Sequence, residues 1–483
     1  MIRVSLAAVA TLTGGRLYRA DPDRVLAGRV AIDSRAVAAG DLFAAFAGDR
    51  VDGHDHVPAA IAAGAAAVLA SRPVPAPCLV VADVREALTR LARHSLAGSD
   101  PVVLGVTGSF GKTTTKDLLA GILEGCGPTV ATAGSYNNEL GLPLTVLRAD
   151  EDTRYLVLEM GAARAGDLRH LTSVAPPRIG VVLAVGHAHV ATFGNGLDAV
   201  AAAKTELVAA LPAARASGTA VLNADDPRVA AMAAATEARI VTFGRNPAAT
   251  ITAADIRLIA GAPEFTLRTP SGSAQVRLGL LGPHQVQNAL AAAAAAWSLD
   301  IPPDQIADRL TQAEPRSASR LAATTRGTDG LTVIDDAYNA FPEAMEAALR
   351  ATAALAAPPT ADRPARRMIA VLGEMVAQGD QSVARHERVG ELLAELDFAA
   401  LIAVDGPDLP FYGGGGPAAM ARTATTARPA MQVRRAADRD EALAHVRELV
   451  RPGDVVLVKA SHELGLSALA AELAAEPAAE GGG

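Results

Sequence analysis

The stretch GVTGSFGKTTTKDLL, residues 105–119, contains the residue types that bind phosphate groups. Gly108 and Gly111 would let the backbone approach a ligand closely. Lys112 could reach the β- and γ-phosphates of a nucleotide, and the Thr113 hydroxyl could bind Mg²⁺. This segment therefore predicts a nucleotide site.

The segments around this motif support the prediction. An apolar strand, PVVLGV, precedes the turn, and the helix TTTKDLLAGILEG follows it. Such a turn directs free backbone N–H groups and the positive helix end at one point. Val106 stands where the usual motif has glycine, but Gly105 and Gly108 flank it. An ordinary strand–helix turn with a solvated lysine is the alternative, and the complete Gly-Lys-Thr-Thr run favours phosphate binding.

Further polar residues follow neighbouring strands. The strand RYLVLEMG ends near Glu159, and IGVVLAVGHAHV ends with His187 and His189. Because ligands of α/β sheets gather at the carboxyl ends of strands, these side chains are candidate metal ligands. Each of them, taken singly, fits an exposed strand end equally well.

Lys204 lies in a helical stripe with Val200, Leu207, Val208 and Leu211, so it falls on the apolar face of a predicted helix. Spacing alone favours a lysine whose ammonium group extends to the edge of that face. The alternative is a lysine buried for a chemical task, since burial lowers its pKa.

The elements that would hold these residues form three blocks. In the first, residues 1–97, VAIDSRAVAAGDLFAAFAG predicts strand, loop and strand, and HVPAAIAAGAAAVLA predicts a helix. In the second, residues 98–313, strands are predicted at Tyr155–Glu159, Ile179–Val185 and Ala220–Asn223, and LGPHQVQNALAAAAAAW predicts a long helix.

The third block, residues 314–483, has predicted strands in LTVIDD, RRMIAVLG, AALIAVDG and DVVLVKAS. FYGGGGPAAMARTATTARPA predicts a flexible loop, and PAAEGGG a frayed tail. The alternation predicts an α/β protein of three domains. They are a small N-terminal α/β domain, a central P-loop domain with a parallel sheet, and a C-terminal Rossmann-like α/β domain.

Composition excludes several classes of function. The 483 residues are half hydrophobic and carry a formal net charge of −8, which argues against nucleic acid or an anionic membrane as the main partner. Cys78 and Cys126 have no metal-like spacing, which favours a reducing cytoplasm. We find neither a convincing signal peptide nor an uninterrupted apolar span of membrane length.

A set of motifs in this order resembles the Mur ligases, ATP-dependent amide-forming enzymes of peptidoglycan precursor synthesis. The motifs are TGSFGKTTT, NNELGLPLTVL, LEMGA, GHAHVATFG, AAAKTEL, NADDP, GPHQVQNALAA and DDAYNAFPEAM, and they span nearly the whole chain. DDAYNAFP, VLGEMVAQGDQSVARHERVG and IDSRAVAAGDLFAAFAGDRVDGHD resemble the type that adds D-alanyl-D-alanine.

The resemblance implies a role for each matching residue. ATP would be held by the phosphate loop, with Asn288 at the adenine, Arg320 at the γ-phosphate and Asp336 on the ribose side. Two Mg²⁺ ions would be bound by Thr113, Glu159, His189 and a carbamylated Lys204, which reverses the interpretation from spacing alone. The implied phosphate-loop residues are Gly108, Ser109, Gly111, Lys112, Thr113 and Thr114.

The implied catalytic set is Lys112, Lys204, His189 and Arg320, and the implied substrate-binding residues are Ser34, Arg35, Asn137 and Asn138. By this resemblance the first domain binds the UDP-sugar, the second ATP, and the third the incoming dipeptide and part of ATP. The expected substrates are UDP-N-acetylmuramoyl-tripeptide and D-alanyl-D-alanine, and the expected protein is a cytoplasmic monomer.

Several positions depart from the family pattern. Leu183 and Ala184 replace a Thr-Asn pair, Phe341 replaces asparagine, and Ala318-Ser319 replaces Pro-Gly before Arg320. In VKASHELG, Ala460 and His462 replace the glycine and the arginine of the family's K-G-S-R pattern. The alternatives are a Mur-like ligase for another carboxylate, an ATP-binding protein that has lost catalysis, and a simple phosphotransferase.

Overall fold

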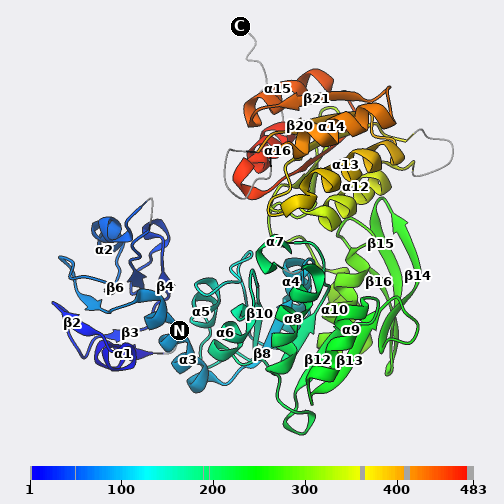
Figure 1. Ribbon diagram of the computed structural model, residues 1–483. Helices are drawn as coiled ribbons and strands as arrows, with labels where there is room; N and C mark the ends of the chain where they lie inside the picture. The colour runs from blue at the N-terminus through cyan, green and yellow to red at the C-terminus, as the bar shows by residue number, and fades with distance from the viewer. Residues whose placement is uncertain are drawn as a thin grey trace.

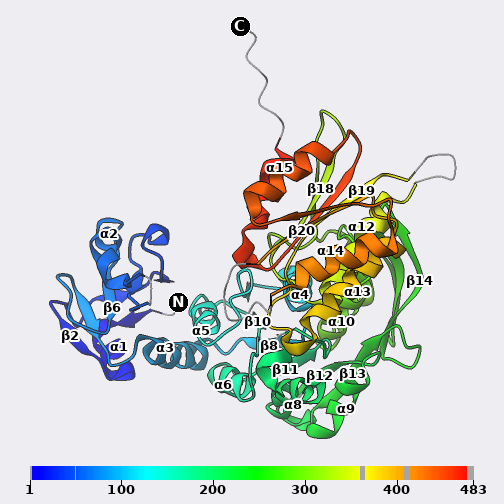
Figure 2. The same cartoon turned by 45° about the horizontal axis from the view of Figure 1, so that its top comes forward.

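The computed structural model describes residues 3–48, 51–188, 190–194, 196–358, 365–406 and 414–475. Within them, three α/β parts follow one another along the chain, each built on its own sheet. Figures 1 and 2 show the N-terminal part beside the central part and the C-terminal part above the opposite end of the central sheet. This is the predicted three-domain α/β architecture.

The first sheet has the strand order β2-β7-β6-β5-β4 and is parallel except for β2. Its strands are β2 Arg16–Tyr18, β4 Val30–Ala31, β5 Leu42–Ala44, β6 Ala67–Ala70 and β7 Cys78–Val80, and β1 Val4–Ser5 pairs separately with β3 Val25–Leu26. Its helices are α1 Leu6–Thr13, α2 Val57–Ala62 and α3 Val84–Ser99.

The predicted single helix over HVPAAIAAGAAAVLA is wrong in its second half. Helix α2 ends at Ala62, Gly64 has a φ of +103°, and β6 follows. A short run of buried alanine, valine and leucine fits a buried strand as well as a helix, so periodicity could not separate the two.

The central sheet has the order β16-β15-β14-β13-β12-β11-β8-β10-β9. Its strands are β8 Val102–Thr107, β9 Thr129–Ala131, β10 Tyr155–Glu159, β11 Ile179–Val182, β12 Thr219–Asn223, β13 Arg239–Gly244, β14 Ile251–Ile259, β15 Ala262–Thr269 and β16 Gly272–Arg277. From β9 to β14 neighbouring strands are parallel, whereas β14, β15 and β16 pair antiparallel. The predicted strands are confirmed with ends shifted by up to three residues, and the antiparallel extension was not predicted.

Helices cover both faces of this sheet (Figure 2). They are α4 Lys112–Glu124, α5 Gly141–Val146, α6 Asp167–Val174, α7 Val190–Phe193, α8 Gly196–Ala209, α9 Pro227–Ala231, α10 Gln285–Trp297 and α11 Pro303–Thr311. One apolar core joins the sheet to α4, α10 and α11, and another joins it to α5, α6 and α8. Residues 289–296 of α10, seven alanines and Leu290, are buried, and the small alanine side chains allow close packing against the sheet.

The third sheet has the order β17-β18-β22-β19-β20-β21 and is parallel except for β17. Its strands are β17 Ala322–Thr325, β18 Thr332–Asp336, β19 Met368–Gly373, β20 Ala400–Val404, β21 Gln432–Ala436 and β22 Val455–Lys459. Its helices are α12 Pro342–Ala356, α13 Ser382–Glu395, α14 Gly416–Ala427, α15 Arg439–Leu449 and α16 Leu466–Ala474.

The loop predicted over residues 411–430 is wrong for most of its length, because α14 occupies it. Residues 411–413 and the predicted tail, residues 477–483, lie outside the described residues. Among the helices that the structure describes, none is both long and apolar enough to cross a membrane.

Candidate active site

The turn between β8 and α4 forms the predicted phosphate loop. Gly111 precedes α4 with a φ of +79°, and a Cβ there would lie 2.4 Å from the Asn288 side-chain oxygen. Glycine is thus needed both for the turn and for the close approach of α10. Lys112 Nζ donates to the carbonyl of Gly108 at 2.8 Å. The loop, the lysine and the free helix end together form an anion site.

Two predicted metal ligands touch at this loop. Thr113 Oγ1 donates to Glu159 Oε2 at 2.9 Å, and Asn137 Nδ2 donates to Glu159 Oε1 at 2.6 Å. Glu159 is buried at the end of β10, and its N–H donates to Thr132 Oγ1 at 3.0 Å. A buried carboxylate beside a hydroxyl suits Mg²⁺, which prefers oxygen ligands.

The Thr113 hydroxyl and the Glu159 carboxylate fit a metal ion that is shared with a nucleotide better than an ion bound by the protein alone. Among the described residues, no group of three or more His, Cys, Asp or Glu side chains could hold a metal ion. Mg²⁺ commonly takes only one or two protein carboxylates and completes its shell with phosphate oxygens and water. His189, the remaining predicted histidine ligand, lies outside the described residues.

Lys204 is buried on α8, with 3% of its surface exposed. Burial lowers its pKa to about 7, and the charge of Lys112 acts in the same direction. The extended-lysine interpretation from spacing is therefore wrong, because the ammonium group does not reach solvent. Near neutral pH, much of this amine is in the unprotonated form, and this is the form that reacts with CO₂.

Helix α10 supplies the other wall of the site. Asn288 is buried, and its Nδ2 donates to Gln285 Oε1 at 2.8 Å. His284, at the start of the same helix, has its pKa lowered to about 4 by burial and then by the charge of Lys459. These groups can hydrogen-bond a flat heteroaromatic ring at the helix start.

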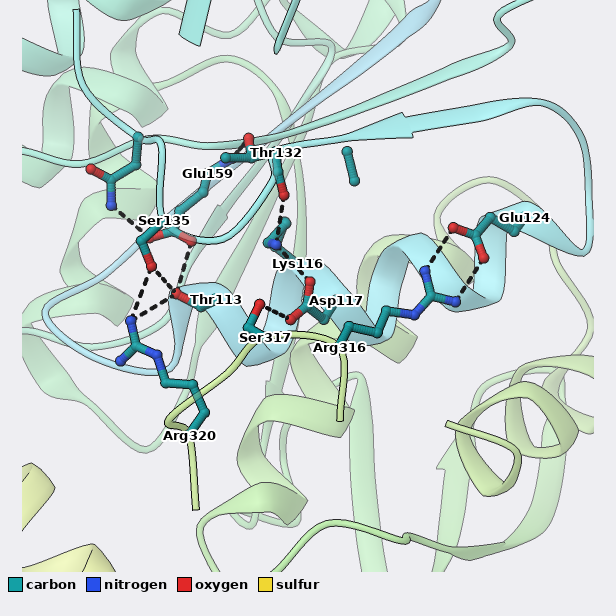
Figure 3. A network of polar contacts seen from close by, with 12 residues as sticks. Thr113, Lys116, Asp117, Glu124, Thr132, Ser135, Glu159, Arg316, Ser317 and Arg320 are labelled. Atoms are coloured by element: carbon teal, nitrogen blue, oxygen red, sulfur yellow. Dashed lines mark hydrogen bonds and ion pairs between the residues drawn. The ribbon is translucent and has the colours of Figure 1, made fainter. Parts of the chain in front are cut away.

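The third part contributes charged groups from the opposite side. Arg320 Nη2 donates to Ser135 Oγ at 3.0 Å and to Thr113 Oγ1 at 3.3 Å (Figure 3). Its guanidinium carbon lies 4.1 Å from the centre of the Tyr338 ring. Asp336, at the end of β18, accepts from Lys459 Nζ at 2.6 Å. Burial raises the pKa of Asp336, and the neighbouring Lys459 opposes that shift.

These groups line one cavity of about 570 Å³ between the central and third parts. It brings together most of the predicted nucleotide and metal residues, namely Ser109, Gly111, Lys112, Thr113, Thr114, Asn137, Glu159, Asn288, Arg320 and Asp336. It also includes residues that sequence reasoning did not single out, namely Phe110, Ser135, His284, Gln285, Tyr338 and Lys459.

Other predicted residues lie elsewhere. Ser34 and Arg35 form a short 3₁₀ helix in the first part, where Arg35 pairs with Asp33 at 2.7 Å, and neither lines this cavity. Asn138 Oδ1 accepts from the N–H groups of Leu140 and Gly141, so it fixes the turn before α5.

His187, another predicted metal ligand, pairs with Glu343 across the boundary between the central and third parts. Its Nδ1 lies 2.7 Å from Glu343 Oε1, and its N–H donates to the same oxygen at 3.0 Å. Phe341, the departure beside this contact, stacks on Phe110 of the phosphate loop with ring centres 6.3 Å apart. The ring of His462, another departure from the family pattern, has its centre 5.9 Å from the centre of the Tyr338 ring.

Comparison with known proteins gives consistent matches over all three parts. Family models described as Mur ligase family catalytic domain, Mur ligase middle domain and Mur ligase glutamate ligase domain match residues 28–95, 106–296 and 320–462. The UDP-N-acetylmuramoyl-tripeptide--D-alanyl-D-alanine ligase of Mycobacterium tuberculosis is 45% identical over 99% of this chain and 98% of that protein. The Escherichia coli protein of the same name is 36% identical over 81% of this chain and 83% of its own length.

Solved structures give the same result. MurF from Acinetobacter baumannii has a TM-score of 0.81 at 30% identity, covering 98% of this chain and 99% of that chain. MurF ligase from Thermotoga maritima in complex with ADP has a TM-score of 0.73 at 28% identity, covering 93% and 97%.

Proposed function

The chain belongs to the Mur ligase family, and we propose that it joins D-alanyl-D-alanine to UDP-N-acetylmuramoyl-tripeptide with the use of ATP. The observation that carries the proposal is the 45% identity, over 99% of the chain, to a ligase named for that reaction. The cavity at the phosphate loop supports it, because it joins an anion site to charged groups of a second part.

The reaction has two steps. A carboxylate oxygen of the tripeptide attacks the γ-phosphorus of ATP, and ADP leaves, which gives an acyl phosphate. The amine of D-alanyl-D-alanine then attacks the carbonyl carbon and loses a proton, and phosphate leaves from the tetrahedral intermediate. The product is a pentapeptide with one new amide bond.

Two anions must meet in the first step, so we assign the main catalytic role to positive charge. Lys112 lies in the phosphate loop itself, Arg320 reaches the loop from the linker to the third part, and together they neutralise the triphosphate. Asn288 binds the adenine and Asp336 the ribose side. Holding both reactants close together in the correct orientation can lower the activation barrier by about 7–11 kcal/mol.

Mg²⁺, when bound, withdraws charge from the phosphate oxygens. Thr113 and Glu159 supply its oxygen ligands, and a carbamate on Lys204 and His189 complete the protein contribution in this proposal. The low pKa of Lys204 supports carbamylation, because CO₂ adds to the neutral amine.

The three parts divide the substrates between them. Residues 1–97 bind the UDP-sugar, with Ser34 and Arg35 near the uridine diphosphate. Residues 98–313 bind ATP, with Asn137 and Asn138 along the path of the sugar-peptide, and residues 314–483 bind the dipeptide. The protein acts as a cytoplasmic monomer.

The direct test is phosphate release from ATP with Mg²⁺, with each substrate omitted in turn and the product mass recorded. Release that needs both UDP-N-acetylmuramoyl-tripeptide and D-alanyl-D-alanine, with a pentapeptide product, supports the proposal. A requirement for another amine would retain the ligase chemistry and reject the D-alanyl-D-alanine assignment. Lys112→Ala should lower turnover by roughly 100-fold or more, as loss of a charge-stabilising group does; normal turnover would reject the scheme.

Carbamylation of Lys204 has its own test. Lys204→Ala should lose activity, and small carboxylic acids such as acetate should restore part of it by replacing the carbamate. Lys112→Ala is the matched control, because a carboxylate cannot replace its ammonium group. Failure of acetate to restore Lys204→Ala would leave Lys204 as an ordinary amine.

A further inference from the structure

Residues 314–321, which lie in the segment between α11 and β17, connect the central and third parts, and we call them the linker. Figure 3 shows it running along α4, the helix that begins at the phosphate loop. Arg320 lies near its end. The position of this arginine therefore depends on what holds the linker at each side.

On the central side, two linker residues bind α4. Ser317 Oγ donates to Asp117 Oδ2 at 2.7 Å, and Arg316 forms two bonds of 2.7 Å with Glu124. The other oxygen of Asp117 accepts from Lys116 Nζ at 2.6 Å. Lys116 is 1% exposed and also donates to the carbonyl of Thr132 at 2.7 Å, so the Asp117 carboxylate is a fixed acceptor (Figure 3).

At its other end, the linker is held by the third part, at the end of β18. Ser319 Oγ donates to Asp335 Oδ2 at 2.8 Å and lies 2.7 Å from Ser467 Oγ. The Leu321 N–H donates to Asp336 Oδ1 at 3.2 Å. These contacts fasten the residues on both sides of Arg320 to the third part.

The backbone around Arg320 adopts a conformation that side chains disfavour. Ser319 has a φ of +56° and Leu321 a φ of +54°, both in the left-handed region. Residues other than glycine persist there only when neighbouring contacts hold them. The hydroxyl of Ser319 supplies such contacts at a position where the family pattern has glycine.

We propose that Ser317 and Ser319 are positioning residues that direct Arg320 to the phosphate loop. Ser317 fixes the linker to α4, Ser319 fixes it to β18, and the guanidinium of Arg320 consequently reaches Thr113 and Ser135. The inference rests on the proposed function in one respect, that Arg320 binds the γ-phosphate of ATP. The exposed Arg316–Glu124 pair contributes less, since solvent weakens ion pairs at such sites.

The test uses variants that spare the buried ion pair. Asp117→Ala would leave Lys116 buried without its partner, so Ser317→Ala is the informative change on that side. On the other side, Ser319→Gly removes the hydroxyl but tolerates the left-handed backbone. Arg350→Ala, which breaks an exposed ion pair with Glu346 on α12, is the matched control and should change nothing.

The first measurement is the affinity for ATP relative to ADP, both with Mg²⁺, which does not depend on the ligase substrates. Each variant should lower this ratio roughly three- to tenfold, the size expected for the net contribution of one typical intramolecular hydrogen bond. Turnover in the ligase assay should fall by a similar factor. Ser317→Thr, which keeps a hydroxyl, should have the affinity ratio and the turnover of the unmodified protein. An unchanged ratio would overturn the inference even where the ligase reaction is confirmed.

The decisive measurement repeats both changes in an Arg320→Ala background. If Ser317 and Ser319 act through Arg320, their effects on the ATP-to-ADP ratio disappear once Arg320 is absent. Effects of undiminished size in that background would mean a general structural role and overturn the inference. Failure of the proposed function shows separately, as absence of pentapeptide product from the unmodified protein.

Discussion

At the scale of single residues, His284 gives the protein a defined response to acid. Its pKa of about 4 lies below the ordinary value of 6.5 because the ring is buried and Lys459, itself paired with Asp336, faces it. Between these two pH values the unfolded chain takes up a proton at His284 and the folded chain does not. The contribution of His284 to the free energy of unfolding therefore falls as the pH falls from about 6.5 to about 4.

Replacing His284 by glutamine should remove this contribution. We expect the free energy of unfolding of His284→Gln, from urea titrations, to fall less steeply over that pH range than that of the unmodified protein. The two curves should run parallel above the range. Parallel curves throughout would show that the histidine is protonated equally in both states.

Sequence reasoning identified the residues whose chemistry is specific and missed those that become important through position. Lys112, Thr113 and Glu159 follow strand ends, and strand ends of a parallel sheet meet at one edge, so their proximity could be predicted. Ser135 and Tyr338 carry common side chains on loops, and no local pattern places a loop residue beside Arg320. Lys204 needed the folded structure, because helical spacing gives a face and not its depth.

At the scale of elements, the parallel strands could be predicted because strands buried on both faces are continuous apolar runs. The antiparallel strand β15 follows another pattern, in which the buried residues Pro263, Phe265 and Leu267 alternate with more exposed ones. That period of two was present in the sequence and was not used. Helix α14 was missed because the glycines before it outweighed the helix-forming alanines within it.

At the scale of the whole molecule, the central and third parts touch directly beside the cavity. Phe110 of the phosphate loop stacks on Phe341, which precedes α12, with an interplanar angle of 24°. A Cβ on Gly186 would lie 2.8 Å from both the Phe110 ring and the Glu343 carboxylate, so a side chain there would require these two groups to move. These contacts join the central and third parts at this side of the cavity.

This contact predicts that Phe341 biases the arrangement of the two parts. An aromatic pair contributes roughly 0.5–1.5 kcal/mol beyond its buried area, so Phe341→Ala should shift the population away from this arrangement by about two- to tenfold. Small-angle X-ray scattering without ligands should then give a larger radius of gyration for Phe341→Ala than for the unmodified protein. Val383→Ala, which truncates an exposed side chain on α13, is the control and should leave it unchanged.

Nucleotide should reverse the expansion, because ATP would contact Lys112 on one side of the cavity and Arg320 on the other. A ligand that binds one arrangement more tightly restores it in proportion to the difference in affinity. Saturating ATP should therefore return the radius of gyration of Phe341→Ala to that of the unmodified protein. The apparent affinity of Phe341→Ala for ATP should be lower than that of the unmodified protein. Equal radii without ATP would mean that the linker and the remaining contacts fix the two parts, and that the Phe110–Phe341 stack follows from their arrangement instead of maintaining it.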